Sequence, residues 1–195
     1  MHRFARNGLA IGSLALALPL LAACADKPAP TVSVPVAPPA LAASDATFVQ
    51  TAAQGSMTEI QAGQLAQTKA KSPKVKAFAT QMVTDHTANF DQLKQVVANK
   101  GVTLPTDVSD QQKTALTQLQ GETGRAFDKD YVADMVAGHE AMLEAFQSEA
   151  QTGTDADLKK YASDTIPAIQ QHLAEAKKLQ GPPMGTHYGH HRHAK

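Results

Sequence analysis

The segment KSPKVKAFATQMVTDHTANFDQLKQVVANKG, from Lys71 to Gly101, decides the fold. It predicts one long helix, because Ser72 is a typical N-cap, Pro73 suits the first helical position, and Gly101 is a typical stop after Lys100. Apolar side chains recur along it at helical spacing, at Val75, Phe78, Met82, Leu93 and Val97. The helix therefore needs apolar partners, and His86 lies within the same stripe.

Three more long helices are predicted around this one, because residues 44–181 are rich in Ala, Gln, Lys, Glu and Leu and lack an alternating strand pattern. These three helices span about 45–71, 125–151 and 155–179, and Ser44 is the predicted N-cap of the first. A short fifth helix is predicted at about 110–120. Pro167 should kink the last helix or separate its first turns. Four long helices with one longer connection, between the second and the third, indicate an all-α up-down four-helix bundle.

Four ionisable residues fall on the faces that this bundle would bury. Glu59 lies on a face of small residues, and His86, His139 and His172 stand at helical spacing from apolar residues. Each is near the middle of its helix, and the middles of antiparallel helices meet. The four are therefore predicted to converge on one layer, where each must pair, form hydrogen bonds or hold a metal, since unpartnered burial is costly.

Two interpretations of this layer remain open. In the first, the histidines form a structural network with Glu59, Asp128, Tyr131 or one another. In the second, three imidazoles and one carboxylate bind Zn or Cu, and soft sulfur atoms nearby would suit Cu(I). The sulfur atoms belong to Met82, Met135 and Met142. A metal site requires ring nitrogens within about 4–5 Å of one point, because metal–nitrogen bonds are near 2 Å.

The sequence does not predict an enzyme. Di-iron bundles carry Glu-x-x-His on two helices, but Val83, Val136 and Ile169 stand three residues before the three histidines. Asp85 and Glu140, the carboxylates next to two of these histidines, are expected at a helix seam or facing solvent. No hydrolase motif or phosphate-binding loop is present, and a balanced charge with 5% aromatic residues argues against a nucleic-acid partner.

The first 23 residues are typical of a bacterial secretory signal peptide. Arg3 and Arg6 precede an apolar run from Leu9 to Leu21, which is too short to span a membrane. The chain's one cysteine, Cys24, ends the string LAAC, which resembles a lipoprotein cleavage site where the thiol is acylated. The resemblance to lipoproteins, with Ala25 rather than Asp after the cysteine, implies an outer-membrane lipoprotein facing the periplasm, anchored by its acyl chains. The alternative is ordinary cleavage and a soluble periplasmic protein.

Two segments flank the predicted helical domain at 44–180. Residues 24–43 are rich in Pro, Ala and Val and predict an extended tether. Residues 181–195 predict a disordered tail that could bind Ni, Cu or Zn loosely. Its candidate ligands are His187, His190, His191 and His193, together with Met184. The other interpretation is a soluble low-complexity tail or a cloning remnant.

Three further strings carry a resemblance to a known family: AAQGSMTEIQAGQLAQTKAKSPKVKAFATQMVTDHT, FDKDYVADMVAGHEAMLEAF and LKKYASDTIPAIQQHLAEAKKL. Over 46–179 the chain resembles the family known as domain of unknown function 4142. The matching positions are Glu59, Asp85, His86, Asp128, Tyr131, His139, Pro167 and His172. The resemblance implies a ferritin-like bundle in the outer membrane or periplasm, and it implies no established reaction.

The leading hypothesis is thus an envelope-anchored, non-enzymatic bundle that binds Cu, Zn or Ni or aids envelope stress tolerance. The alternative is an interaction module whose His/Glu core is structural and whose surface binds an envelope protein partner. The two differ in whether the rings share one point or are each bonded to a neighbouring carboxylate, hydroxyl or carbonyl.

Overall fold

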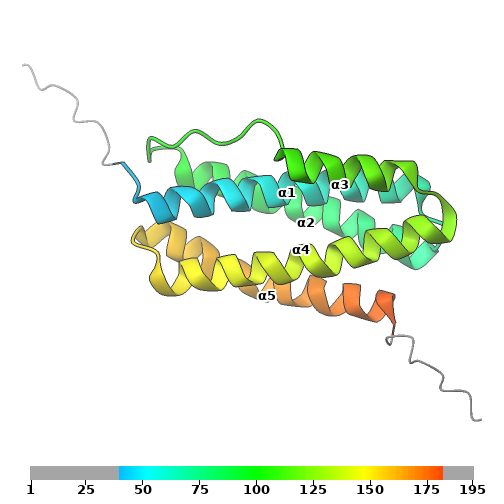
Figure 1. Cartoon of the computed structure of the whole chain (residues 1–195). Coiled ribbons are helices and arrows are strands. Elements are labelled where there is room, and N and C mark those ends of the chain that lie inside the picture. Colours follow the sequence, from blue (N-terminus) through cyan, green and yellow to red (C-terminus); the bar gives the residue numbers. More distant parts are fainter. Residues whose placement is uncertain (1–39, 182–195) are drawn as a thin grey trace, which may run out of the picture. The chain divides into compact units, whose positions relative to one another are not determined.

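A computed structural model describes residues 40–181, and within this range every regular element is a helix (Figure 1). The helices are α1 (Ala43–Lys69), α2 (Pro73–Val97), α3 (Asp110–Gly121), α4 (Gly124–Thr152) and α5 (Ala156–Gln180). The predicted all-α bundle with a short extra helix in the second connection is confirmed. The predicted signal peptide, most of the tether, and the tail beyond Gly181 lie outside the described residues.

The helix ends follow local chemistry. The Ser72 hydroxyl accepts a hydrogen bond from the Val75 N–H and Pro73 opens α2, as predicted. The prediction for Ser44 is wrong: α1 begins at Ala43, and Ser44 lies exposed in the first turn, where its hydroxyl donates to Asp45. The helix α2 ends at Val97, three residues before the predicted end, and a turn leads to Gly101, whose φ of 65° favours glycine.

Pro167 does not divide the last helix. The helix α5 runs from Ala156 to Gln180 with Pro167 inside it, on an exposed position. The expected separation of its first turns is therefore wrong. The helix begins where the Asp155 side chain accepts hydrogen bonds from the N–H groups of Asp157 and Leu158.

The long connection after α2 determines the topology. The four long helices form a ring of neighbours in which α1 packs on α2 and α4, and α5 packs on α4 and α2. The end of α1 meets the start of α4, where Ala70 bridges Gly124. The connection that carries α3 thus returns the chain to that end, so α2 and α4 run in the same direction, as in bundles with one long crossover. The up-down order therefore holds within the pairs α1–α2 and α4–α5 but not between α2 and α4. The helix α3 covers α1 and α4 from outside (Figure 1).

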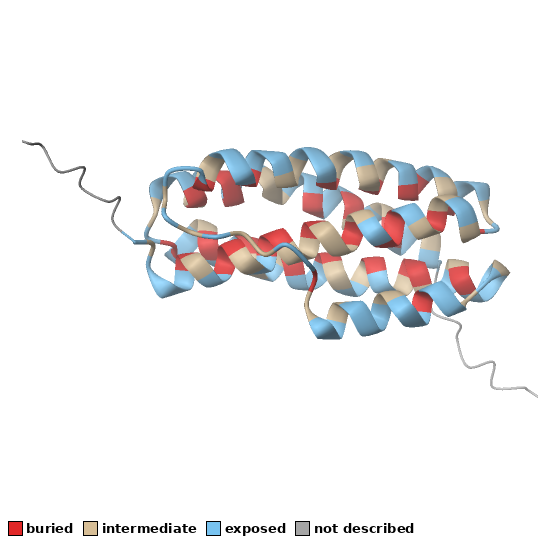
Figure 2. Cartoon of the chain, turned by 90° about the horizontal axis from the view of Figure 1, so that it is seen from above, coloured by how far each residue is buried: buried red, intermediate tan, exposed pale blue. Residues whose placement is uncertain are grey.

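The bundle's core is divided into two apolar clusters by a polar layer. The inner faces of the helices carry the buried residues (Figure 2). The first cluster includes Phe78, Met82, Phe127, Tyr131 and Met135, and the second includes Phe48, Leu93, Met142, Phe146 and Tyr161. On each long helix the residues of one cluster precede those of the other. The polar layer between them contains Ser56, Glu59, His86, His139 and His172, all buried.

Close packing of α1 on α2 depends on small residues. A Cβ added at Gly63 would stand 2.7 Å from a methyl group of Val83 and 3.1 Å from the Ala79 carbonyl oxygen. The absence of a side chain at Gly63 thus permits the close approach of α1 and α2 at this position. Among residues 40–181, no helix combines the length and the apolar character that a membrane crossing requires.

Candidate metal centre

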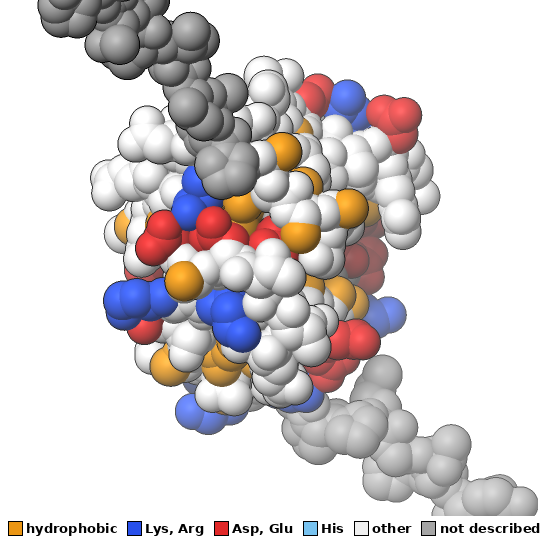
Figure 3. All heavy atoms as spheres, turned by 90° about the vertical axis from the view of Figure 1, so that its left-hand side faces the viewer, with side chains coloured by type: hydrophobic (Ala, Val, Ile, Leu, Met, Phe, Trp, Pro, Cys, Tyr) orange, Lys and Arg blue, Asp and Glu red, His pale blue; other side chains and the backbone are white. Residues whose placement is uncertain are grey.

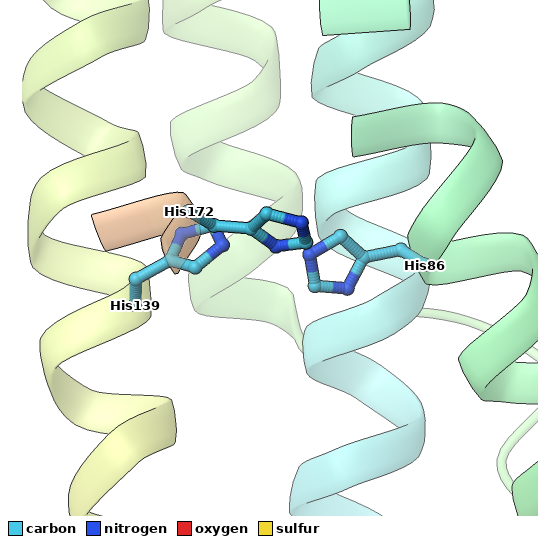
Figure 4. Close-up of side chains that lie close together, drawn as sticks. All are labelled: His86, His139 and His172. Atoms are coloured by element: carbon cyan, nitrogen blue, oxygen red, sulfur yellow. The ribbon is translucent and has the colours of Figure 1, made fainter. Parts of the chain in front are cut away.

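The three histidines enter one layer because each replaces an apolar residue in the stripe of its own helix. His86 follows Met82 by one helical turn on α2, and His139 follows Met135 by one turn on α4. His172 follows Ile169 on α5. All three side chains point into the bundle toward one another (Figure 4). Their residues are 4%, 0% and 4% exposed, so water solvates none of them well.

The rings lie close enough to share one ion. The ring centroids of His86 and His139 are 5.5 Å apart, those of His86 and His172 are 5.5 Å apart, and those of His139 and His172 are 5.4 Å apart. One nitrogen from each ring lies within 4.8 Å of the other two. Three imidazole nitrogens bound to one metal at about 2 Å would be about 3.4 Å apart. A contraction of roughly 1 Å, within the reach of side-chain torsions, would form a trigonal set.

Two of the rings are oriented by hydrogen bonds on their outer nitrogens. His139 Nδ1 donates to the Met135 carbonyl oxygen at 2.8 Å, which leaves Nε2 as the nitrogen with a free lone pair. His172 Nε2 donates to Asp85 Oδ2 at 2.9 Å, which leaves Nδ1 with the free lone pair. Within residues 40–181, neither of those nitrogens nor either nitrogen of His86 has a hydrogen-bond partner. Each ring therefore retains at least one nitrogen that makes no hydrogen bond to a described residue and could bind a metal ion.

Burial keeps two of the three imidazoles, those of His86 and His139, neutral. It lowers the pKa of His86 to about 3, helped by the nearness of His139 and His172. It lowers the pKa of His139 to about 4, although the hydrogen bond to Met135 acts in the opposite direction. A neutral imidazole is the form that binds a metal, so at neutral pH both rings are ready to act as ligands.

Glu59 lies beside the histidines rather than among their free nitrogens. Its Oε1 is 3.4 Å from His139 Nδ1, the nitrogen that already donates to Met135. Its Oε2 has no partner among the described residues. Burial and the charge of Asp134 raise the pKa of Glu59 to about 8, so the carboxyl is largely protonated at neutral pH. Of the four predicted residues, the structure thus brings three into one cluster and places Glu59 behind His139.

Asp85 has a role that the sequence did not reveal. It lies at the seam between α2 and α5, with its side chain 43% exposed, and it orients His172. The seam was one of its predicted locations, but this bond was not predicted. Glu140, the corresponding carboxylate next to His139, instead pairs with Lys177 at 2.8 Å on the surface. One signal for Asp85 was its position next to a histidine in the sequence, which Glu140 shares because it directly follows His139. The family resemblance, which includes Asp85 but not Glu140, was the other signal.

Within residues 40–181, the other proposed network members form no hydrogen bond with the histidines. Asp128 accepts hydrogen bonds from the N–H groups of Lys71 and Ser72, so it fixes the turn between α1 and α2 to α4. The Tyr131 hydroxyl is buried in the described part of the chain without a partner. Burial, with the nearby Glu59 carboxyl, raises the pKa of Tyr131 above its usual value. The candidate tail ligands His187, His190, His191 and His193 lie outside the described residues.

Comparison with known proteins identifies a family and a fold. The family described as "Domain of unknown function (DUF4142)" matches residues 30–179. No match is found among curated proteins. The DUF305 fragment from Deinococcus radiodurans is structurally similar, with a TM-score of 0.65 and 10% identity, covering 73% of this chain and 99% of that chain.

Two solved structures of CopM are also similar to this bundle. The Cu(II)-bound form has a TM-score of 0.60 and 15% identity, covering 70% of this chain and 95% of that chain. The Cu(I)-bound form has a TM-score of 0.57 and 17% identity, covering 69% and 93%. At these identities the likeness shows a shared helical fold.

Proposed function

The chain belongs to the DUF4142 family, and we propose that its bundle binds one transition-metal ion through His86, His139 and His172. Two observations carry the proposal: each of the three rings has at least one nitrogen without a hydrogen-bond partner within residues 40–181, and one nitrogen of each ring lies within 4.8 Å of the other two. Buried polar atoms without partners cost free energy, and one metal ion would satisfy all three rings at once.

The outer hydrogen bonds support the same proposal. Ligand histidines in metalloproteins usually donate their second ring nitrogen to a carboxylate or a backbone carbonyl. His172 donates to Asp85 and His139 donates to the Met135 carbonyl, so each has the orientation that a ligand requires. His86 has no such bond within residues 40–181.

Copper is the metal that we favour. Imidazole donors suit Cu, Zn and Ni, so the ligand type alone leaves these three. The His86 and His139 rings are neutral, and so, for the most part, is the nearby Glu59 carboxyl. A buried site with little negative charge favours a monovalent ion over a divalent one, since the cost of desolvation rises steeply with charge. The similar CopM structures are a Cu(II)-bound and a Cu(I)-bound form, which supports copper as the metal.

The proposed role is metal binding at the cell envelope without catalysis. The sequence contains no Glu-x-x-His pair, and apolar clusters lie on both sides of the histidine layer. We propose that acylated Cys24 anchors the chain to the outer membrane and that residues 24–43 hold the bundle in the periplasm. There it would hold metal ions and so contribute to stress tolerance, with the tail histidines as a weaker second binding segment.

The test uses residues 40–181, which contain both apolar clusters and exclude the tail histidines. The purified segment is titrated with Cu(I), Cu(II), Zn(II) and Ni(II), and bound metal and melting temperature are measured. We expect one copper ion per chain, a raised melting temperature, and loss of binding in His139→Leu. Asp85→Asn should weaken binding by roughly tenfold to a hundredfold. Its matched control is Glu140→Gln. This change also removes a carboxylate next to a histidine in the sequence, but one that pairs with Lys177 and not with an imidazole ring.

A second function is favoured by the contacts of Glu59 and Asp85. A structural network would also place carboxylates beside His139 and His172, as these two are placed. In that case the bundle is an interaction module that binds an envelope protein through its surface. Absence of bound metal, with Asp85→Asn lowering stability more than Glu140→Gln, would establish the network and refute the metal centre.

A further inference from the structure

Four cationic side chains surround one hollow at the end of the bundle where α2 and α4 begin and α5 ends. They are Lys74, Arg125, Lys129 and Lys178, and the hollow has a volume of about 840 Å³. All four residues are exposed. None of them forms an ion pair with another described residue, whereas Lys94, Lys100, Lys113, Lys160 and Lys177 all do.

The positive charge of this hollow is poorly compensated. Its lining includes a single carboxylate, Asp128, whose two oxygens accept the N–H groups of Lys71 and Ser72. At the opposite end of the bundle, where α1 begins, acidic and basic side chains lie side by side (Figure 3). There, Lys100 contacts both Asp155 and Asp157. The cations that line the hollow lack such partners among the described residues, and their uncompensated charge favours an anion there.

The floor of the hollow is apolar. Val75 and Val132 line it and are 4% and 3% exposed, and the partly buried Leu179 closes one side. A second hollow continues along α2 and α5, sharing Lys74, Lys178 and Leu179 and adding Ala77 and Phe78. Its one carboxylate, Glu175, accepts a hydrogen bond from Gln171. Cations at the rim and hydrocarbon below suit a ligand with a charged head and an apolar chain.

We propose that this hollow binds an anionic amphiphile, a single alkyl chain that carries a phosphate or carboxylate head. The cations of the rim would contact the head, and Val75, Val132 and Leu179 would contact the chain. The protein's own tail is a poor occupant, since residues 182–195 contain Arg192 and Lys195 and no acidic residue. This site is independent of the histidine layer and does not rest on the metal proposal.

The test measures binding of alkyl phosphates by calorimetry, below their micelle concentrations, to residues 37–195, which include all five helices and both apolar clusters. The probes are inorganic phosphate, octyl phosphate and decyl phosphate. We expect roughly fifteenfold tighter binding of decyl than of octyl phosphate, because each buried methylene contributes about fourfold. Inorganic phosphate should bind far more weakly than either.

Paired charge reversals locate the site. Lys129→Glu with Lys178→Glu should weaken decyl phosphate binding roughly tenfold or more, since both head contacts become repulsive. The control is Lys94→Glu with Lys160→Glu, which changes the net charge of the protein by the same amount. These two lysines form exposed ion pairs with residues three and four positions away, and such pairs contribute little to stability. This control should bind within about twofold of the parent.

Three outcomes would overturn the proposal. The first is equal weakening by both pairs of reversals, which would mean a general charge effect. The second is inorganic phosphate binding as tightly as decyl phosphate, which would mean an anion site without a chain. The third is binding to phosphatidylglycerol vesicles with none to dispersed decyl phosphate, which would mean a membrane surface rather than an amphiphile in a hollow.

Discussion

Replacing Glu149 with glutamine should stabilise the bundle at high pH and leave it almost unchanged at low pH. Glu149 lies near the end of α4, is 4% exposed, and has a carboxyl oxygen without a partner among the described residues. Burial raises its pKa from 4.5 to about 7, with further contributions from the charges of Asp45 and Asp155, while Lys159 opposes the change. The folded protein thus holds a proton that the unfolded chain releases.

The sign and size follow from proton linkage. A raised folded-state pKa adds stability that is fully present below about pH 4.5 and is lost as the pH rises through about 7. A difference between 4.5 and about 7 corresponds to about 3 kcal/mol at most. With relaxation around the ionised carboxyl, we expect Glu149→Gln to gain about 1–3 kcal/mol at pH 8.5 and under about 0.5 kcal/mol at pH 4.5.

Urea unfolding of residues 40–181 at the two pH values measures this difference. Glu144→Gln is the matched control, because Glu144 lies exposed on the same helix. If the parent and Glu149→Gln differ by the same free energy at both pH values, the carboxyl titrates alike in the folded and unfolded states. The reasoning from its burial would then be refuted.

Three further substitutions test the packing and the turns by the free energy of unfolding in urea. Gly63→Ala should cost about 1–3 kcal/mol because the new methyl group meets Val83, whereas Gly121→Ala, with nothing within 4 Å, should cost nothing measurable. Asp128→Ala should cost about 1–3 kcal/mol and speed amide exchange in the α1–α2 turn, which loses both of its acceptors. Asp45→Ala should cost about 2–4 kcal/mol at pH 7, since this buried carboxylate accepts hydrogen bonds from the α4–α5 turn. That cost should shrink below about pH 3.8, because those bonds outweigh burial and lower the pKa of Asp45.

The fold could be predicted because its determinants are local. Helical spacing of apolar residues and the Ser72–Pro73 start each depend on residues a few positions apart. The shared layer of His86, His139 and His172 also followed from local information, since each lies near the middle of its own helix. Ser44 misled because serine is a typical N-cap residue, but the helix starts at Ala43, two residues before the predicted start. The neighbouring Asp45 accepts hydrogen bonds from the distant α4–α5 turn.

The details of the site could not be predicted because they depend on distant contacts. Asp85 and His172 are 87 residues apart, and their hydrogen bond requires the angle at which α2 meets α5. Glu59 shares the layer with the histidines, but the side from which it approaches His139 is set by the packing of α1 on α4. The protonation of the buried groups likewise follows from packing, because burial moves the pKa of imidazole and carboxyl in opposite directions.

The long connection between α2 and α4 divides the bundle into two helical hairpins, α1–α2 and α4–α5. The histidine cluster takes one ring from the first hairpin and two from the second. A metal ion bound there would therefore act as a reversible cross-link between two locally formed halves, as a disulfide does between distant segments. The bound ion should slow the separation of the two hairpins and leave each hairpin turn free to open. Metal binding would therefore slow amide exchange near the histidines more than amide exchange at the turns.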